Sequence, residues 1–380
     1  MKAIGILGTA SNVGKSWLVA ALGAWLRRQG IRVAPFKAQN MSNNSYVTLE
    51  GGEIGRAQAV QAQACGLRPI VEMNPILLKP SQGQSQLVVL GLAQEHLTAI
   101  DYYDKIPTLW QVVVDCLEFW RRQCDVLLLE GAGSPVELNL MARDIVNLRP
   151  IAYLQGKWLL VGDIEKGGVF AQLIGTYHLL PTAMQWQGLG LVVNKFRGDL
   201  SLFRDAADYF ARHIPIPYLG VLPFANDLQP ESEDSLCRPD EIGGSGETIA
   251  CIQFPYLSNS QDILPWRQDQ GVQTVWVTAP SQLHNAKVII LPGTKDTIAD
   301  LLWLRATNLD QAIINAYGRG AVIIGICGGY QMLGRTISDP TGNAGMAGEI
   351  AGLGLLPVRT VFHQYKIVQQ VEIEYKFDRW

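Results

Sequence analysis

The chain has 380 residues, of which 48% are hydrophobic and 17% are charged, and its formal net charge at pH 7 is −3. This length exceeds one ordinary hydrophobic core, so we expect two domains, and the weak net charge without a basic run gives no basis for nucleic-acid binding. No run of about 18 apolar residues suggests a membrane span, and six cysteines without CxxC or metal-ligand spacing indicate reduced thiols and a cytoplasmic protein.

The first motif is GTASNVGKS, which lies between a short apolar run and an amphipathic stretch. A glycine-rich turn that leads into a helix N-terminus presents several backbone N–H groups to a phosphate. Lys15 adds a positive charge, and the hydroxyl of Ser16 suits a magnesium ion. Five residues rather than four separate Gly8 from Gly14, which departs from the common spacing. The residues that we predict to hold a nucleotide here are Gly8, Thr9, Gly14, Lys15 and Ser16.

Apolar runs alternate with helical stretches through the first two thirds of the chain, which predicts a parallel sheet with helices on its faces. The expected strands are AIGIL, RVAPF, DVLLLEG, KWLLVGD and GLGLVVNK. Each of them ends in polar or glycine residues. Because ligands of open parallel sheets bind outside the carboxyl ends of the strands, we expect the site at this edge.

Two carboxylates stand at strand ends in this half of the chain. Glu130 closes LLLE before two glycines, and Asp163 closes LLVGD. Either can reach a magnesium ion that bridges the phosphates, while the other orients water or Lys15. The sequence does not rank the two, so the candidate metal ligands are Ser16, Glu130 and Asp163.

A polar stretch follows the second strand, in APFKAQNMSNNS. Lys37 can place a second positive charge against a transferring phosphoryl group. The uncharged side chains after it suit a ligand with several carboxylates or amides, although an ordinary Asn-rich turn is the alternative. These loop residues are Gln39, Asn40, Ser42, Asn43 and Asn44. Farther along, Asn194 in VVNKFRGD is a candidate for adenine recognition.

An acidic segment rich in Pro, Gly and Ser at residues 226–247 predicts a linker. We therefore expect one domain over residues 1–235 and a second over residues 248–380. A second alternation of strands and helices begins at TIACIQFPYL and includes AKVIILPG and GAVIIGICGGYQMLG.

The second strong motif is G-x-C-x-G, formed by Gly325, Cys327 and Gly329 on a strand-to-helix turn. It matches the G-x-S-x-G nucleophile elbow with sulfur in place of oxygen. Small flanking residues permit the strained turn, and the following helix N-terminus favours a thiolate. We predict that Cys327 is a nucleophile, with a buried core cysteine as the alternative. Cys237 and Cys251 lack such surroundings.

A loop that activates a substrate with ATP and a cysteine elbow that releases ammonia from glutamine occur together in amidoligases. The N-terminal half resembles the dethiobiotin synthetase type of phosphate-loop fold, which has the same extra loop residue and a similar EGAG. Over nearly its whole length the chain closely resembles the cobyric acid synthase family of the cobalamin pathway. The stretches that carry this resemblance are APFKAQNMSNNSYVTLEGGEIGRAQAVQAQACGLRPIVEMNPILLKP, EGAGSPVELNL, GDIEKGGVFA, VNKFRGD and GICGGYQMLG.

This resemblance implies an α/β phosphate-loop domain followed by a flavodoxin-like class I glutamine amidotransferase domain. It implies a ligase that amidates the b, d, e and g propionates of adenosylcobyrinic acid a,c-diamide, with ATP and Mg²⁺ as cofactors and glutamine as co-substrate. A substrate carboxylate would accept the phosphoryl group, while Lys15 and Lys37 neutralise charge. Cys327 would form a glutamyl thioester and release ammonia. Arg143 and Arg197 are candidate partners of the substrate's carboxylates.

The chain departs from this family after the elbow. A cysteine amidotransferase needs a histidine base, which in the family lies near the end of a longer chain. Here only His363 follows Cys327, and residues 363–380 no longer resemble the family. We expect an incomplete second domain, weak or absent glutaminase activity, and amidation fed by free ammonia.

Alternatives of different kinds remain. Cobyrinic acid a,c-diamide synthase shares the architecture, although APFKAQNMSNNS and EIGRAQ favour cobyric acid synthase. The membrane- or DNA-positioning ATPases of the deviant phosphate-loop group carry an early loop lysine where this chain has Ala10, and they lack a cysteine elbow. A non-catalytic nucleotide- or corrinoid-binding remnant is the third alternative.

Overall fold

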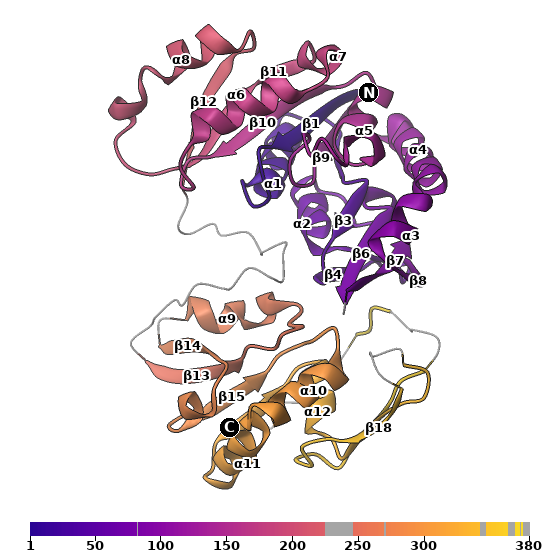
Figure 1. The fold of residues 1–380 in the computed structure, drawn as a ribbon, viewed down its shortest axis with the longest axis vertical. Coiled ribbons are helices and arrows are strands. Elements are labelled where there is room, and N and C mark those ends of the chain that lie inside the picture. Colours follow the sequence, from indigo (N-terminus) through magenta and orange to yellow (C-terminus); the bar gives the residue numbers. More distant parts are fainter. Residues whose placement is uncertain are drawn as a thin grey trace.

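The computed structural model describes residues 1–81, 83–224, 246–269, 271–342, 347–363, 369–372 and 374. Within these residues the chain forms two α/β units, the first from β1 to β12 and the second from β13 to β19 (Figure 1). The predicted linker at residues 226–247 lies almost wholly outside the described residues, as does Cys237.

The first unit is built on a six-stranded sheet in which every pair is parallel. Across the sheet the strands are β12 (Tyr218–Pro223), β11 (Gly188–Phe196), β10 (Lys157–Asp163), β1 (Lys2–Gly8), β9 (Val126–Glu130) and β2 (Val33–Phe36). All five strands expected from the sequence belong to this sheet. Because β1 lies between β9 and β10, the winding of the chain reverses there, and the carboxyl ends beside this point form a natural ligand site.

The helices of the first unit pack on this sheet, on one another or on the inserted strands described below. They are α1 (Lys15–Arg28), α2 (Arg56–Ala64), α3 (Ala99–Asp104), α4 (Ile106–Gln123), α5 (Leu148–Tyr153), α6 (Val169–Leu179), α7 (Thr182–Gln185) and α8 (Ala206–His213). α1 packs on β1, β2 and β9, and α6 packs on β10. Every residue of β9 is buried, as expected for a strand that is covered on both sides. No helix within the described ranges is long and apolar enough to cross a membrane.

A small β-structure is inserted after β2, where the sequence suggested only a loop. Its strands are β3 (Gln39–Met41), β6 (Ile76–Ser81), β7 (Gln84–Val89) and β8 (Leu92–Leu97), with a separate hairpin of β4 (Ser45–Val47) and β5 (Glu53–Gly55). The expectation that Gln39 and Asn40 lie in a loop is therefore wrong. Their backbone pairs with that of β6, a partner distant in sequence that a local reading of polar residues does not reveal.

The second unit has its own parallel sheet, in the order β14 (Val272–Val277), β13 (Glu247–Ile252), β15 (Val288–Leu291) and β16 (Val322–Gly325). A further sheet contains β18 (Gly348–Ala351), β17 (Thr336–Asp339) and β19 (Arg359–Val361). The helices are α9 (Leu264–Gln268), α10 (Thr297–Ala306), α11 (Leu309–Gly318) and α12 (Gly328–Leu333). The described residues also include five short 3₁₀ helices, which are η1 (Val71–Met73), η2 (Met141–Arg143), η3 (Leu200–Phe203), η4 (Ser260–Ile263) and η5 (Pro280–Leu283).

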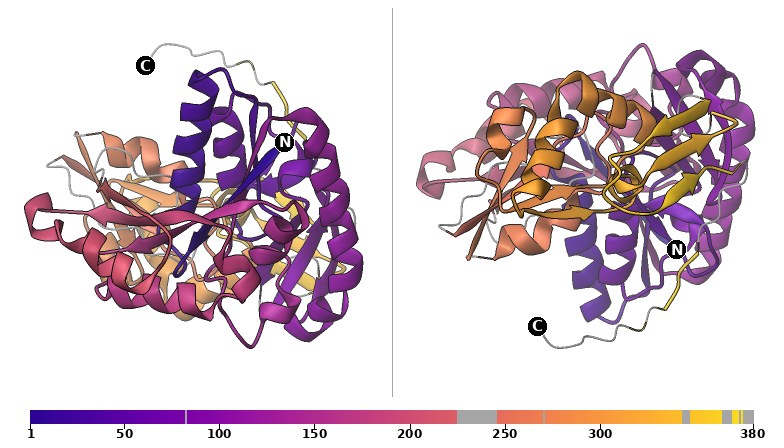
Figure 2. Two further views of the ribbon diagram at one scale, coloured as in Figure 1. Left: turned by 90° about the horizontal axis from the view of Figure 1, so that it is seen from above. Right: turned by 90° about the horizontal axis from the view of Figure 1, so that it is seen from below.

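Each unit has a separate hydrophobic core. The buried apolar residues before β13 form clusters around the first sheet, and those from Ile249 to Leu353 form another cluster around the second. The second unit lies on the side of the first that carries the inserted strands β4, β6, β7 and β8 (Figures 1 and 2). Hydrogen bonds join the units there: the backbone N–H of Asn259 donates to Asn44 Oδ1 at 2.7 Å, and Lys295 Nζ donates to Gln86 Oε1 at 2.9 Å.

Candidate active site

The phosphate loop connects β1 to α1, and close packing fixes both of its glycines. Gly14 has φ of +100°, and a Cβ atom there would lie 2.1 Å from Asn194 Nδ2. A Cβ atom on Gly8 would lie 2.6 Å from a methyl group of Val13. Because real Cβ atoms do not approach neighbours so closely, only glycine fits at these two positions.

Side chains brace the loop from several directions. Asn194 Nδ2 donates to the Val13 carbonyl at 2.8 Å, and Thr9 Oγ1 donates to Gln172 Oε1 at 3.1 Å. Lys15 Nζ donates to the carbonyls of Ala10 at 3.0 Å and Gly133 at 3.2 Å. Lys15 therefore lies between the phosphate loop and the turn that follows β9. The amide N–H₂ of Asn194 thus holds the loop backbone. The predicted contact of Asn194 with adenine stays a prediction.

The Glu130 carboxylate is the centre of a buried hydrogen-bond network. Oε1 accepts from Ser16 Oγ at 2.7 Å and from Lys37 Nζ at 3.0 Å. Oε2 accepts from Gln58 Nε2 at 3.3 Å and from Gln61 Nε2. Both members of the ion pair are buried, with side-chain exposures of 3% for Lys37 and 0% for Glu130. The structure thus brings together three predicted residues, Ser16, Lys37 and Glu130.

Asp163 flanks the phosphate loop on the other side of β1. Its Oδ2 accepts from Lys195 Nζ at 2.8 Å, and its Oδ1 accepts from the backbone N–H of Glu165 at 3.0 Å. The register pairs Ile6 of β1 with Glu130. The two candidate metal-binding carboxylates therefore stand at the ends of the strands on either side of β1, and Glu130 is the one joined to Ser16.

Sequence reasoning missed Gln58 and Gln61. Both lie on α2, three residues apart, and are almost completely buried. Two glutamines at this spacing lie on the same face of a helix, and the small residues around them could have indicated that this face is buried. Gln61 Oε1 is buried and has no hydrogen-bond partner among the residues that the structure describes. A buried acceptor beside Ser16 and Glu130 fits a water molecule in the shell of a bound magnesium ion.

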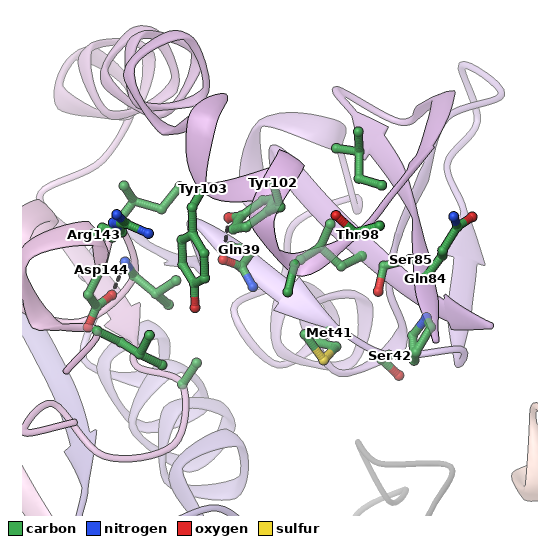
Figure 3. A pocket seen from close by; sticks show the side chains of 18 of the residues that line it. Gln39, Met41, Ser42, Gln84, Ser85, Thr98, Tyr102, Tyr103, Arg143 and Asp144 are labelled. Atoms are coloured by element: carbon green, nitrogen blue, oxygen red, sulfur yellow. Dashed lines mark hydrogen bonds between the residues drawn. The ribbon is translucent and has the colours of Figure 1, made fainter. Parts of the chain in front are cut away.

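A cavity of about 570 Å³ lies between the inserted strands, the turn after β9, η2 and the segment 255–257 of the second unit. Figure 3 shows its polar side chains, with Gln39 beside Tyr102 and Arg143 beside Tyr103. Apolar residues complete the wall: Met41, Leu78, Leu97, Leu140, Met141, Ile145, Val146 and Leu257. A large ligand with apolar surfaces and a few polar groups suits such a lining.

Specific contacts orient the polar side chains of the cavity. Tyr102 Oη donates to Gln39 Oε1 at 2.5 Å, and burial raises the pKa of this tyrosine, so it remains a neutral donor. The Arg143 guanidinium lies 5.2 Å from the centre of the Tyr103 ring. Of the predicted substrate residues, Gln39, Ser42, Asn43 and Arg143 line the cavity.

Two further predicted residues lie elsewhere. Asn40 Nδ2 donates to Gln58 Oε1 at 2.9 Å and so belongs to the network around Glu130. Arg197 contacts Glu165 and lies over the ring of Phe224. Neither residue is among those that line the cavity in the part of the chain the structure describes.

The turn 131–134 separates the phosphate loop from the cavity. Gly133 accepts the Lys15 hydrogen bond through its carbonyl, whereas its neighbours Ala132 and Ser134 line the cavity. Asn147 holds this turn, because its amide exchanges hydrogen bonds with the backbone of Ala132 at 3.1 and 2.9 Å. A group bound in the cavity and a phosphate bound at Lys15 would therefore lie next to each other, on either side of the turn 131–134.

Cys327 forms a strained elbow between β16 and α12. Its backbone has φ of 50° and ψ of −112°, a conformation that non-glycine residues rarely adopt. A Cβ atom on Gly325 would lie 2.6 Å from the Tyr330 Cα atom, and one on Gly329 would lie 2.0 Å from the Leu291 carbonyl oxygen. Cys327 is exposed at the apex. This is the arrangement of a nucleophile elbow.

The remaining described cysteines are buried thiols. Burial raises the pKa of Cys124 to about 11 and that of Cys65, Cys116 and Cys251 to about 12. Because the thiolate is the reactive form, these residues are poor nucleophiles. His363, the histidine that follows Cys327 in the sequence, is exposed just beyond β19. The weak or absent glutaminase activity expected from the sequence stays a prediction.

A buried carboxyl group connects the elbow's surroundings to the cavity wall. Asp300 on α10 accepts hydrogen bonds from the Thr294 hydroxyl and, at 3.3 Å, from the backbone N–H of Tyr256. Tyr256 lines the cavity, and a Cβ atom on Gly293, next to Thr294, would lie 3.7 Å from Cys327 Cβ. Burial raises the pKa of Asp300 to about 7.

Two protein families match the chain. The CobQ/CobB/MinD/ParA nucleotide binding domain matches residues 4–236, and the CobB/CobQ-like glutamine amidotransferase domain matches residues 248–378. Together with the parallel sheets of both units, these matches confirm the predicted fold class, a phosphate-loop domain followed by a second α/β domain.

Curated relatives are similar over most of the chain. A cobyric acid synthase of Roseiflexus castenholzii is 48% identical over 370 residues, which cover 97% of this chain and 75% of that protein. A cobyric acid synthase of Herpetosiphon aurantiacus is 47% identical with the same coverage. Among solved structures, the signal recognition particle receptor FtsY from Elizabethkingia anophelis in complex with GDP is 15% identical, with a TM-score of 0.37 and coverage of 61% of this chain and 60% of that one.

Thiol alkylation should single out the elbow. We expect iodoacetamide to modify Cys327 in the native protein before it modifies any of Cys65, Cys116, Cys124 and Cys251, because those thiols are buried and their pKa values are raised. Peptide mapping by mass spectrometry identifies each modified residue, and Cys327→Ser is the control. Equal rates at Cys327 and Cys251 would contradict the elbow's accessibility.

Glu130→Gln should destabilise the first unit. The change removes the charge that faces Lys37 and turns an amide N–H₂ toward the donors Ser16, Gln58 and Gln61, so we expect a loss of about 3–5 kcal/mol in the free energy of unfolding. Urea denaturation measures it. Glu247→Gln, which breaks the exposed pair with Lys287, should cost less than about 1 kcal/mol. Similar losses for both variants would refute the importance of the network.

Asp300 should make stability fall as pH rises. With a folded-state pKa raised from 3.8 to about 7, the folded protein binds one more proton than the unfolded chain between these values. Stability is therefore lost as pH rises through this window, on the order of 4 kcal/mol by pH 8. Asp300→Asn, which imitates the neutral acid, should flatten this dependence in denaturation between pH 5 and 8, while the exposed control Asp208→Asn should not. An unchanged profile in Asp300→Asn would exclude this role.

Proposed function

The chain belongs to the cobyric acid synthase family, and from this premise we propose that it amidates corrinoid carboxylates with ATP and with nitrogen from glutamine or ammonia. The proposed substrate is adenosylcobyrinic acid a,c-diamide, whose b, d, e and g propionates become carboxamides in cobyric acid. In this proposal residues 1–235 form the synthetase domain, residues 226–247 the linker, and residues 248–380 the amidotransferase domain.

The observation that carries the proposal is the shared turn 131–134. One face of it touches Lys15 of the phosphate loop, and the other face lines the cavity. A nucleotide at the loop and a carboxylate in the cavity would be neighbours, which is the arrangement that phosphoryl transfer between them needs.

The chemistry begins with a carboxylate, which is a poor acyl donor because amide formation would expel oxide or hydroxide. A carboxylate oxygen attacks the γ-phosphorus of ATP, the bond to the ADP oxygen breaks, and an acyl phosphate forms. Ammonia then attacks the acyl carbon and loses a proton, and phosphate leaves with the carbon–oxygen bond electrons. Lys15 compensates the negative charge that the phosphoryl group spreads over its oxygens.

The residues that would hold magnesium are Ser16, Glu130 and Asp163, with Gln61 Oε1 available to a water molecule of its shell. When bound, magnesium neutralises phosphate charge. Lys37, Gln58 and Gln61 fix the Glu130 carboxylate in one orientation, so the site is organised before any ligand binds. Lys37 acts in this proposal through Glu130 as well as through its charge.

Cys327 would supply ammonia from glutamine. Its thiolate attacks the carboxamide carbon, the carbon–nitrogen bond breaks, and the proton that the thiol gave up is returned to the departing nitrogen, so that ammonia leaves as a glutamyl thioester forms. Water then hydrolyses the thioester. The exposed apex of the elbow supports access of glutamine to the sulfur.

Parallel assays with glutamine and with ammonium salt test this function. We expect ATP hydrolysis and amide formation with the a,c-diamide, and less with cobyrinic acid, the substrate of the related diamide synthase. Glutamine-dependent amidation by the wild-type chain should be weak or absent, and Cys327→Ser should remove what there is of it while leaving ammonium-dependent amidation intact. Lys15→Ala should lower both at least about 100-fold, because it removes a charge at the transferring phosphoryl group. Absence of corrinoid-dependent ATP hydrolysis with either nitrogen source would refute the proposal.

A further inference from the structure

Asn43 carries a buried acceptor that the protein itself does not satisfy. The residue follows β3, lines the cavity and is only 9% exposed. Its Nδ2 donates to the Pro80 carbonyl at 3.2 Å, whereas its Oδ1 is buried and has no hydrogen-bond partner within the described part of the chain. Buried polar atoms without a partner are rare because their desolvation is not compensated, and such an atom in a cavity wall indicates a ligand that donates to it.

The orientation of this amide is fixed by chemistry. The Pro80 carbonyl can only accept a hydrogen bond, so the amide N–H₂ of Asn43 must face it. Rotating the amide by half a turn would place two acceptors against each other. The group that remains for a ligand is therefore an acceptor.

The charges of the cavity favour the same kind of ligand. Among its described lining residues the charged ones are Glu137, Arg143 and Asp144, so carboxylates outnumber cations. The single cation, Arg143, lies over the Tyr103 ring. A carboxamide bound near Glu137 or Asp144 would meet less repulsion than a carboxylate at the same place.

We propose that Asn43 Oδ1 accepts a hydrogen bond from a carboxamide N–H₂ of the corrinoid and thereby selects an amidated side chain over a carboxylate at that position. This inference rests on the proposed function and names the group that gives it specificity. A carboxamide donates to Oδ1, while an ionised carboxylate has only acceptors and would place a negative oxygen against it. A site built to satisfy a buried polar atom discriminates more strongly than an apolar pocket.

Binding measurements with two corrinoids test the inference. Intrinsic tryptophan fluorescence is titrated with cobyrinic acid a,c-diamide and with cobyrinic acid, both carrying the same axial ligands, in the absence of ATP. We expect the wild-type chain to bind the diamide at least about tenfold more tightly, and Asn43→Ala to bring the ratio of the two dissociation constants close to one. The change should come mainly from weaker binding of the diamide.

Two further variants separate specificity from folding. Asn43→Ser keeps a hydroxyl acceptor and should retain part of the preference. Asn315→Ala, on the exposed face of α11, should leave the ratio unchanged. Nucleotide binding measured on the same samples reports whether each variant is folded.

The outcomes distinguish a failure of the inference about Asn43 from a failure of the proposed function on which it rests. A wild-type chain that binds the diamide, with a ratio that Asn43→Ala and Asn43→Ser do not alter, would overturn the role of Asn43 and leave the proposed function standing. A folded wild-type chain that binds neither corrinoid would overturn the proposed function and the inference with it.

Discussion

The burial of the Glu130 carboxylate is the constraint on which the first unit depends. A charge removed from water needs compensation on every side, and here the donors come from separate segments of the chain: Ser16, Lys37, Gln58 and Gln61. The phosphate loop, the end of β2 and α2 must therefore assemble together. Asn40 extends the network toward the cavity by bonding to Gln58. Nucleotide site and cavity wall are thus parts of one hydrogen-bonded structure.

The features predictable from the sequence are those fixed by local patterns. The phosphate loop and the Cys327 elbow each combine glycines at crowded positions with a strand-to-helix change, and both appear in the structure as expected. The strands β3 to β8 could not be predicted in the same way, because their short and polar sequences gain stability from partners distant in the chain. Gln58 and Gln61 could not be predicted for the same reason, because they act by hydrogen-bonding to Glu130, which is distant from them in the sequence.

The Glu130 carboxylate and the Cys327 thiol are held in place by different physical effects. At Glu130 a full set of donors holds a carboxylate still, so precision comes from compensated charge. At Cys327 a backbone conformation that is intrinsically unfavourable exposes a thiol, and close packing against Leu291 and Tyr330 maintains it. Both lie beyond the carboxyl ends of parallel strands, where the fold leaves room for ligands.

The cavity takes part of its wall from each unit, since Pro255, Tyr256 and Leu257 face the inserted strands of the first. Any molecule that fills it binds only when the two units are docked. Occupancy and docking are therefore thermodynamically linked, each strengthening the other. At a concentration 100 times its dissociation constant, such a molecule would add about 2.7 kcal/mol to the docked state, acting as a reversible non-covalent cross-link between two separate hydrophobic cores.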